Sequence, residues 1–94
     1  MAEYQDARST DSGAIVSGSS VNRDLITLGW ATLVAGANDL TVDFREDVSG
    51  NPIKFSLSAK AGNSFTQRDI GILFRENIHV TFSVTGGSLA VGWR

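Results

Sequence analysis

The sequence of 94 residues contains no cysteine and only one histidine and one proline. Without cysteine the chain can form neither a disulfide framework nor a thiolate metal site, so cysteine usage gives no indication of its compartment. The single histidine, His79, cannot supply a multi-histidine metal centre, and no serine stands in a Gly-x-Ser-x-Gly nucleophile motif. We therefore predict no cofactor and no metal, and we expect that the chain is not an enzyme.

The chain also lacks a charge excess and a long apolar run. Eight basic residues are scattered among ten acidic ones, which leaves no basic patch of the kind that nucleic-acid binding requires. No apolar stretch approaches the roughly 20 residues of a membrane span, and the polar start, Met1 to Asp6, does not resemble a signal peptide. We expect a protein synthesised in a cytoplasm, with neither nucleic acid nor a membrane as a partner.

Alternation of apolar and polar residues is the strongest structural signal present. Residues 77–85 and 88–94 each alternate with the period of two that indicates a half-buried strand. The pair Gly86-Gly87 between them favours a two-residue hairpin turn. All three apolar pairs of that hairpin would share one face, and His79 would lie near Arg94 on the other face. The predicted apolar pairs are Val84 with Leu89, Phe82 with Val91, and Val80 with Trp93.

Other strands follow from the same pattern. Residues 40–45 and 53–58 alternate on either side of a turn-rich segment and predict a second hairpin. About seven strands at this spacing, with no helical stretch, indicate an all-β fold: an antiparallel β-sandwich or jelly-roll-like domain. The remaining predicted strands lie at residues 25–30, around Phe65 and at 70–74. The aromatic residues expected in the core are Phe44, Phe55, Phe82 and Trp93.

The first 20 residues differ in composition from the rest. They are rich in serine and glycine, and Ile15 and Val16 form their only bulky apolar pair. Such a stretch buries too little surface to offset the entropy of ordering it. The sequence thus predicts a flexible N-terminal arm over residues 1–20, with a short edge strand near Ala14 to Ser17, and a single β-sandwich domain over residues 21–94.

Two groups of residues invite a functional interpretation. Asp43, Glu46 and Asp47 cluster at a turn, but their spacing matches no known calcium loop, so solvated loop carboxylates are the favoured interpretation. Trp30 lies on a strand that alternates poorly, so it is either buried on both faces or part of a contact between subunits; a sugar-stacking role is a further alternative. The residues predicted to contact a partner are Tyr4, Arg8, Ile15, Val16 and Trp30.

Two segments of the sequence resemble a known group of proteins. The run from Phe74 to Arg94, with its Thr-Gly-Gly turn and its Trp-Arg ending, resembles the ending of many small virion proteins of tailed bacteriophages. Thr41 to Phe65 is similar to their central hairpin. Within the C-terminal run, Asn77-Ile78 stands where those proteins have glycine and leucine. The resemblance spans about residues 23–94 and implies a β-sandwich accessory of the particle.

The function that this resemblance implies is structural. A capsid cement or decoration protein would clamp neighbouring major capsid subunits on the virion surface and stabilise the head, with the major capsid protein and copies of itself, as a homotrimer, for partners. The N-terminal arm would become ordered on a neighbouring subunit. A neck, tail or fibre component built from the same module is an alternative, and a carbohydrate-binding β-sandwich is the alternative from another functional class.

Overall fold

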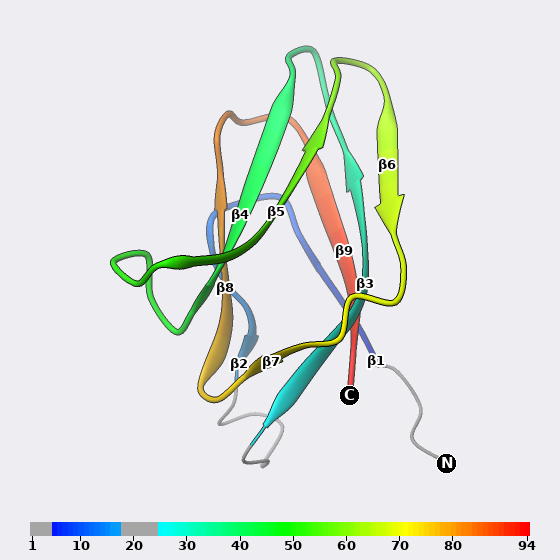
Figure 1. The fold of residues 1–94 in the computed structure, drawn as a ribbon. Coiled ribbons are helices and arrows are strands. Elements are labelled where there is room, and N and C mark those ends of the chain that lie inside the picture. Colours follow the sequence, from blue (N-terminus) through cyan, green and yellow to red (C-terminus); the bar gives the residue numbers. More distant parts are fainter. Residues whose placement is uncertain (1–4, 18–24) are drawn as a thin grey trace.

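The computed structural model describes residues 5–17 and 25–94, and within these residues the chain is all-β (Figure 1). The strands form two antiparallel sheets that pack face to face. The fold class predicted from the sequence is confirmed, with nine strands in the described residues instead of about seven. The strands are β1 (Gln5–Ser9), β2 (Gly13–Ser17), β3 (Ile26–Val34), β4 (Leu40–Glu46), β5 (Ile53–Ala59), β6 (Ser64–Gln67), β7 (Ile72–Phe74), β8 (Asn77–Phe82) and β9 (Ser88–Trp93).

The order of the strands is that of a jelly roll. Sheet A has the order β1-β9-β3-β6, with β7 also paired to β3, and sheet B has the order β2-β8-β4-β5. Most connections carry the chain from one sheet to the other; only those between β4 and β5 and between β6 and β7 stay within one sheet. Because β6 and β7 pair with different parts of β3, they act together as one interrupted strand. Two four-stranded layers wound in this way are the jelly-roll architecture.

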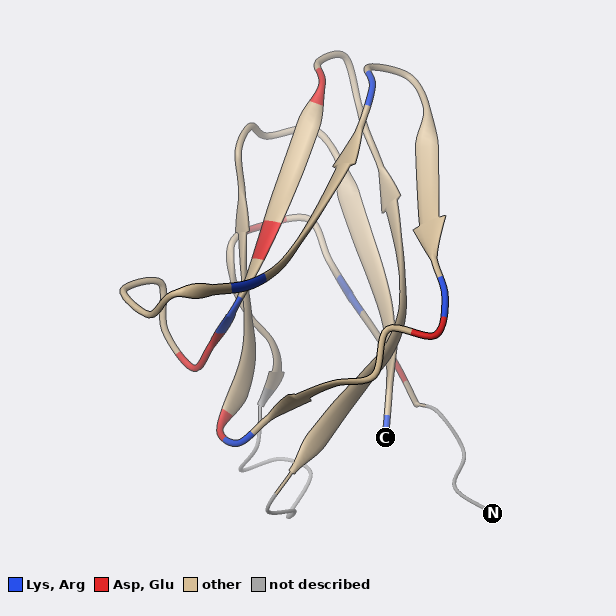
Figure 2. Ribbon diagram, in the orientation of Figure 1, with Lys and Arg blue, Asp and Glu red and all other residues tan. Residues whose placement is uncertain are grey.

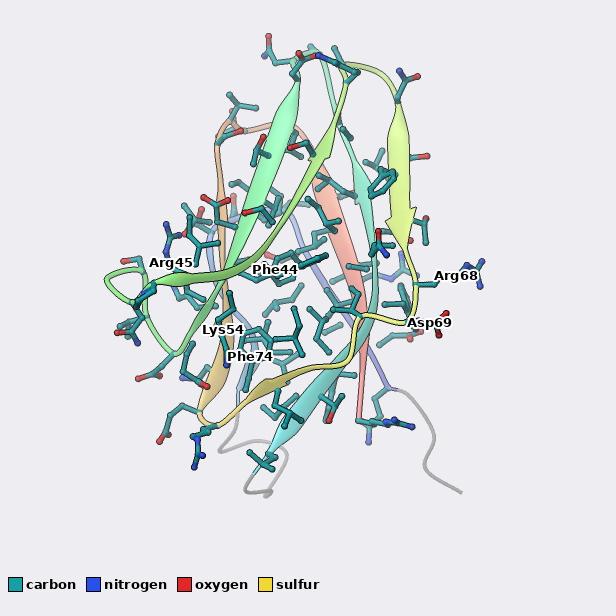
Figure 3. All side chains as sticks on the ribbon, viewed as in Figure 1. Phe44, Arg45, Lys54, Arg68, Asp69 and Phe74 are labelled. Atoms are coloured by element: carbon teal, nitrogen blue, oxygen red, sulfur yellow. The ribbon has the colours of Figure 1, made fainter. Side chains whose placement is uncertain are left out.

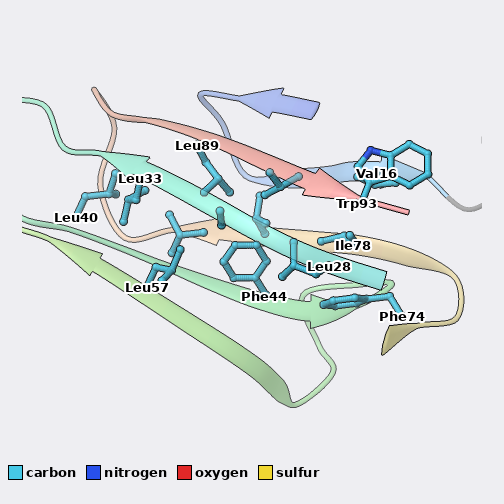
Figure 4. Packing of buried hydrophobic residues seen from close by; sticks show 14 of the residues in the cluster. Val16, Leu28, Leu33, Leu40, Phe44, Leu57, Phe74, Ile78, Leu89 and Trp93 are labelled. Atoms are coloured by element: carbon cyan, nitrogen blue, oxygen red, sulfur yellow. The ribbon is translucent and has the colours of Figure 1, made fainter. Parts of the chain in front are cut away.

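The core lies between the two sheets, where alternate residues of facing strands meet (Figure 4). Phe44 of β4 is fully buried, and its ring centroid lies 5.5 Å from that of Phe55 on the neighbouring strand. Trp93 is also buried, whereas Phe55 and Phe82 are partly buried and pack against the same cluster. Each large apolar side chain buried here contributes about 1.5–3 kcal/mol to stability. The core assignment of all four aromatic residues is confirmed.

The predicted hairpin formed by β4 and β5 is confirmed. The two strands pair antiparallel with their apolar residues opposite one another, and a bulge between Phe44 and Arg45 ends the regular register. The alternation of both strands therefore places one face on the core and the polar face in solvent. The apolar cross-strand pairs are Leu40 with Ala59, Val42 with Leu57, and Phe44 with Phe55.

The predicted hairpin at Gly86-Gly87 is wrong. Strand β8 lies in sheet B between β2 and β4, whereas β9 lies in sheet A between β1 and β3. The apolar faces of β8 and β9 therefore meet across the core, because alternation reports which face is buried and not which sheet holds the partner. The proximity predicted for His79 and Arg94 is also wrong: His79 lies opposite Arg45 of β4, and the backbone of Arg94 pairs with Thr27.

Gly36 and Gly87 instead allow two connections, those after β3 and β8, to pack closely at one end of the sandwich. A Cβ atom on Gly36, in the connection after β3, would lie 2.1 Å from the carbonyl oxygen of Gly86. A Cβ atom on Gly87 would lie 2.4 Å from Leu40 Cδ2 and 2.7 Å from the carbonyl oxygen of Val34. Contacts this short exclude any side chain, so the close approach of the two backbones requires glycine at both positions.

The segment predicted to be a flexible arm supplies two strands of the sandwich. Strand β1 pairs with β9 along its whole length, and β2 pairs with β8 at the edge of sheet B. The edge strand expected near Ala14 to Ser17 is therefore confirmed, but the arm is wrong for residues 5–17. Backbone pairing with a strand already in place and burial of Val16 compensate for the low apolar content. Residues 1–4 and 18–20 of the predicted arm lie outside the described residues.

Candidate functional site on the outer face of sheet A

The outer face of sheet A brings together two of the predicted contact residues, Arg8 and Trp30. Strand β9 runs between the strands that carry them. Since the larger residues of β9 point into the core, its outward side chains are small and leave a low strip along the middle of the sheet. This strip, the β9 strip, consists of Ser88, Ala90 and Gly92.

One hollow of about 370 Å³, the β1-side groove, lies over Ser88 and Ala90 of the β9 strip. Its walls are Arg8 of β1 and, on the other side, Thr32 and Val34 of β3. Arg8 of β1 and Thr32 of β3 both pair with Ala90 of β9, one from each side, so they lie opposite one another across the strip. Val34 is an apolar side chain that is 43% exposed. The groove thus combines one cation, one exposed apolar side chain and a floor of small residues.

A second hollow of about 500 Å³, the Trp30 hollow, lies on the β6 side of the same face. Strands β3 and β6 contribute Trp30, Thr32 and Thr66, and the connection from β6 to β7 contributes Arg68 and Asp69. Figure 3 shows the last two side chains pointing away from the ribbon at that connection. Thr32 is common to both hollows, so they are neighbours on one continuous face.

A bulge explains why Trp30 faces outward. In the pairing of β3 with β9, Leu28 is opposite Trp93 and Trp30 is opposite Gly92, with the register shifted between them. The extra residue at this bulge, Gly29, reverses the alternation, so that Leu28 and the residues after Trp30 can both contribute to the core. Trp30 is half-buried on the outer face. The poor alternation visible in the sequence is the signature of this bulge.

The other predicted contact residues have different positions. Tyr4 lies outside the described residues. Ile15 on β2 is half-buried and packs against the core cluster. Val16 is only 4% exposed and belongs to the core, so its prediction as a contact residue is wrong. Sequence reasoning missed Thr66, Arg68 and Asp69, since only the pairing of β6 with β3 places them beside Trp30.

Charged residues of both signs are spread over the two sheets and the loops (Figure 2). Within residues 5–17 and 25–94, no helix has the length and apolar character needed to cross a membrane. Among the same residues, no group of three histidine, cysteine, aspartate or glutamate side chains is arranged to hold a metal ion.

The carboxylates at the end of β4 each have a partner within the chain. Asp43 accepts a hydrogen bond from Ser56 Oγ at 2.7 Å. Asp47, whose backbone φ is 68°, accepts one from Asn77 Nδ2 at 2.6 Å. Glu46 points to a different element, the turn between β7 and β8. The three side chains therefore fix local structure, and the favoured interpretation as solvated carboxylates underestimated their contacts.

Glu46 is the most connected of these carboxylates. Its two oxygens accept the backbone N–H groups of Arg75 (2.6 Å) and Glu76 (2.8 Å), and Lys54 Nζ lies 3.6 Å away. Lys54 Nζ also lies 4.6 Å from the centroid of the Phe74 ring. Both side chains are labelled in Figure 3. Burial of the carboxylate by itself would raise its pKa, but the two N–H donors and Lys54 outweigh that effect and hold the pKa of Glu46 below its ordinary value of 4.5.

Glu46→Gln is expected to lower the free energy of unfolding by about 1–2 kcal/mol, because an amide replaces only part of two charge-assisted hydrogen bonds. The contribution of Glu46 is fully present above pH 4.5 and is lost as the pH falls through the depressed folded-state pKa. Urea unfolding across this range checks the prediction: the difference between wild type and variant should disappear in acid. Glu76→Gln, at an exposed position of the same turn, is the matched control, and equal effects of the two substitutions would contradict the assignment.

Comparison with solved structures finds the same type of fold elsewhere. A protein of Bacillus endospore appendages, described as a novel family of disulfide-linked pili, matches with a TM-score of 0.50 and 12% identity over 98% of this chain and 89% of that chain. PirA matches with a TM-score of 0.47 and 9% identity over 100% of this chain and 95% of that one. The coat protein of Tobacco streak virus matches with a TM-score of 0.38 and 14% identity over 97% and 79% of the two chains.

At this level of identity, the similarity to the appendage protein shows a shared fold and nothing further. The other two TM-scores are too low to carry an argument. No model of a protein family matches the sequence, and no curated protein is significantly similar to it.

Proposed function

We propose that this chain is a structural protein of an assembled particle, and more specifically a decoration protein on the surface of a bacteriophage capsid. It would bind neighbouring major capsid subunits and copies of itself, as a trimer, and it would act by binding and not by catalysis. The proposal rests on the resemblance of Thr41 to Phe65 and of Phe74 to Arg94 to small virion proteins, together with the jelly-roll order of the strands.

The single observation that favours this function most is the β1-side groove. Small residues such as Ser88 and Ala90 let the surface of a partner approach the sheet closely, while Val34 offers apolar area and Arg8 a charged contact. The domain measures 37 × 31 × 18 Å, so its broad faces can accommodate the roughly 800 Å² per partner of a stable interface. An open groove with these residues fits another protein surface better than it fits a small substrate.

Attachment of this kind would stabilise the particle by mass action, because a protein that binds only the assembled lattice lowers the free energy of that state. In the Bacillus appendages, a domain of similar fold belongs to disulfide-linked pili. The present sequence has no cysteine, so contacts between its copies would be noncovalent. The contact with the particle would use the folded sandwich, since residues 5–17 are integrated into both sheets.

Co-sedimentation with undecorated phage capsids tests the proposal, alongside light scattering to give the mass in solution. We expect saturable binding by a trimer, and Ala90→Arg should weaken that binding at least about tenfold, since a bulky cation would fill the groove beside Arg8. Ala14→Arg, at an exposed alanine of β2 in the other sheet, is the matched control and should bind like the wild type.

Failure of the folded wild-type protein to bind capsids would overturn the decoration role and would direct the search to isolated necks and tails. If neither arginine substitution weakens capsid binding, the proposed role in the virion stands. The β1-side groove is then rejected as the contact surface. Thermal unfolding of the variants shows whether a loss of binding reflects a loss of folding.

A further inference from the structure

The Trp30 hollow has features that a protein contact surface does not require. Trp30 lies opposite Gly92, and a Cβ atom on Gly92 would lie 1.8 Å from Trp30 Nε1 and 2.3 Å from Cε2. One side of the indole therefore rests directly on the backbone of β9. Because Trp30 also lines the hollow, part of its side chain borders the space that a ligand would occupy. The absence of a side chain at Gly92 is what allows the ring to lie in this position.

The polar side of the hollow is held in place by the bulge in β3. The backbone N–H of Ile70 donates to the carbonyl of Gly29, and that of Gly71 donates to the carbonyl of Leu28, both at 2.8 Å. Asp69, just before them, has a φ of 54°, in the left-handed region that aspartate adopts more readily than most residues other than glycine. These two hydrogen bonds hold the connection that carries Arg68 and Asp69 against β3.

The charged groups of the hollow are available for a ligand. With the residues that the structure describes, neither the guanidinium of Arg68 nor the carboxylate of Asp69 makes a hydrogen bond or an ion pair. At the back of the hollow, the hydroxyl groups of Thr32 and Thr66 lie 2.9 Å apart and share a hydrogen bond. The site thus presents hydrogen-bond donors, acceptors and hydroxyl groups around one aromatic ring.

We propose that the Trp30 hollow binds a neutral saccharide ring. The apolar C–H face of a pyranose would pack on the indole of Trp30, while adjacent hydroxyl groups would donate to Asp69 and accept from Arg68. Side chains of opposite sign next to each other favour a neutral polyhydroxylated ligand over a phosphate or an amine. The hollow lies on the β6 side of sheet A and shares Thr32 with the β1-side groove, so a glycan bound here would lie beside a partner bound in that groove.

The test uses the two tryptophans of the full chain, Trp30 in the hollow and Trp93 in the core, as probe and internal reference. Methyl glycosides of glucose, galactose, mannose and N-acetylglucosamine are titrated into ¹⁵N-labelled protein. We expect saturable changes in the indole N–H signal of Trp30 and in the amides of Arg68 and Asp69 for at least one sugar. The dissociation constant should be on the order of 1 mM, and Trp93 should not respond.

Trp30→Ala and Asp69→Asn should each weaken this binding at least tenfold, whereas Arg75→Ala, in the exposed Arg-Glu pair of the β7–β8 turn, should not. The proposal is overturned if none of the four glycosides shifts the Trp30 signal, or if folded Trp30→Ala protein binds as well as the wild type. Capsid co-sedimentation of Trp30→Ala separates the two proposals. If the variant loses sugar binding but keeps capsid binding, the Trp30 hollow serves the sugar and is not needed for the capsid contact.

Discussion

Replacing Val16 by aspartate is expected to remove roughly 3–5 kcal/mol of stability, the sum of lost apolar burial and the burial of a carboxyl group. Val16 is 4% exposed, belongs to the core cluster of Figure 4 and pairs with Ile78 of β8. A domain of 94 residues has a total stability of about 5–14 kcal/mol, so the variant should be partly or wholly unfolded at ambient temperature. Urea unfolding followed by tryptophan fluorescence measures the effect.

Ala14→Asp on the same strand is the matched control. Ala14 is exposed on the outer face of sheet B, opposite His79, so a carboxylate there remains in water and should change stability by less than about 0.5 kcal/mol. The pair of substitutions decides between an integrated strand and a detachable arm. An arm would tolerate aspartate equally at both positions, and a neutral result for Val16→Asp would show that β2 does not contribute to the core.

The second large effect is expected from Gly36→Ala, which should cost about 3 kcal/mol. The added methyl group would lie 2.1 Å from the carbonyl oxygen of Gly86 and 2.8 Å from its carbonyl carbon. Both of these atoms belong to the backbone, so the clash cannot be relieved by rotating a side chain, and the two connections must separate. The same separation would expose Leu40, which is buried below them. The midpoint of urea unfolding should fall accordingly.

Gly50→Ala is the control for this substitution. Gly50 lies in the connection between β4 and β5, and a Cβ atom there would meet nothing within 4 Å. Alanine at this position should leave stability unchanged or raise it by up to about 1 kcal/mol, because it restricts the unfolded chain. Equal stability of the two variants would mean that the connections after β3 and β8 do not pack as closely as the structure places them.

The sequence predicts well which face of a strand is buried, but it predicts poorly which strand lies next to it in the sheet. In the β4–β5 hairpin both predictions are correct, because the short connection leaves Val42 and Leu57 no other pairing. In β8 and β9 the apolar residues are buried as predicted, but the two strands belong to different sheets. Alternation carries no information that separates a neighbour in one sheet from a neighbour across the core. The local preference of Gly86-Gly87 for a turn was overridden by tertiary packing.

The same distinction applies to the site. Arg8 and Trp30 were predicted to contact a partner, and the structure places both on the outer face of sheet A. Thr66, Arg68 and Asp69 have no distinguishing local pattern, and they reach Trp30 only through the pairing of β6 with β3 across more than thirty residues of sequence. Val16 was misassigned because composition alone describes residues 1–20 as too polar to be ordered, although backbone pairing at a sheet edge needs few apolar residues.

The position of β9 between β1 and β3 determines when the protein can fold during its synthesis. Sheet A cannot be completed until residues 88–93 have left the ribosome, and until then β1 has no partner. The β4–β5 hairpin, whose contacts are local, is free to form much earlier. A nascent chain would therefore carry the apolar faces of several strands without their covering layer, which makes translation speed and chaperone access matter for the yield of native protein.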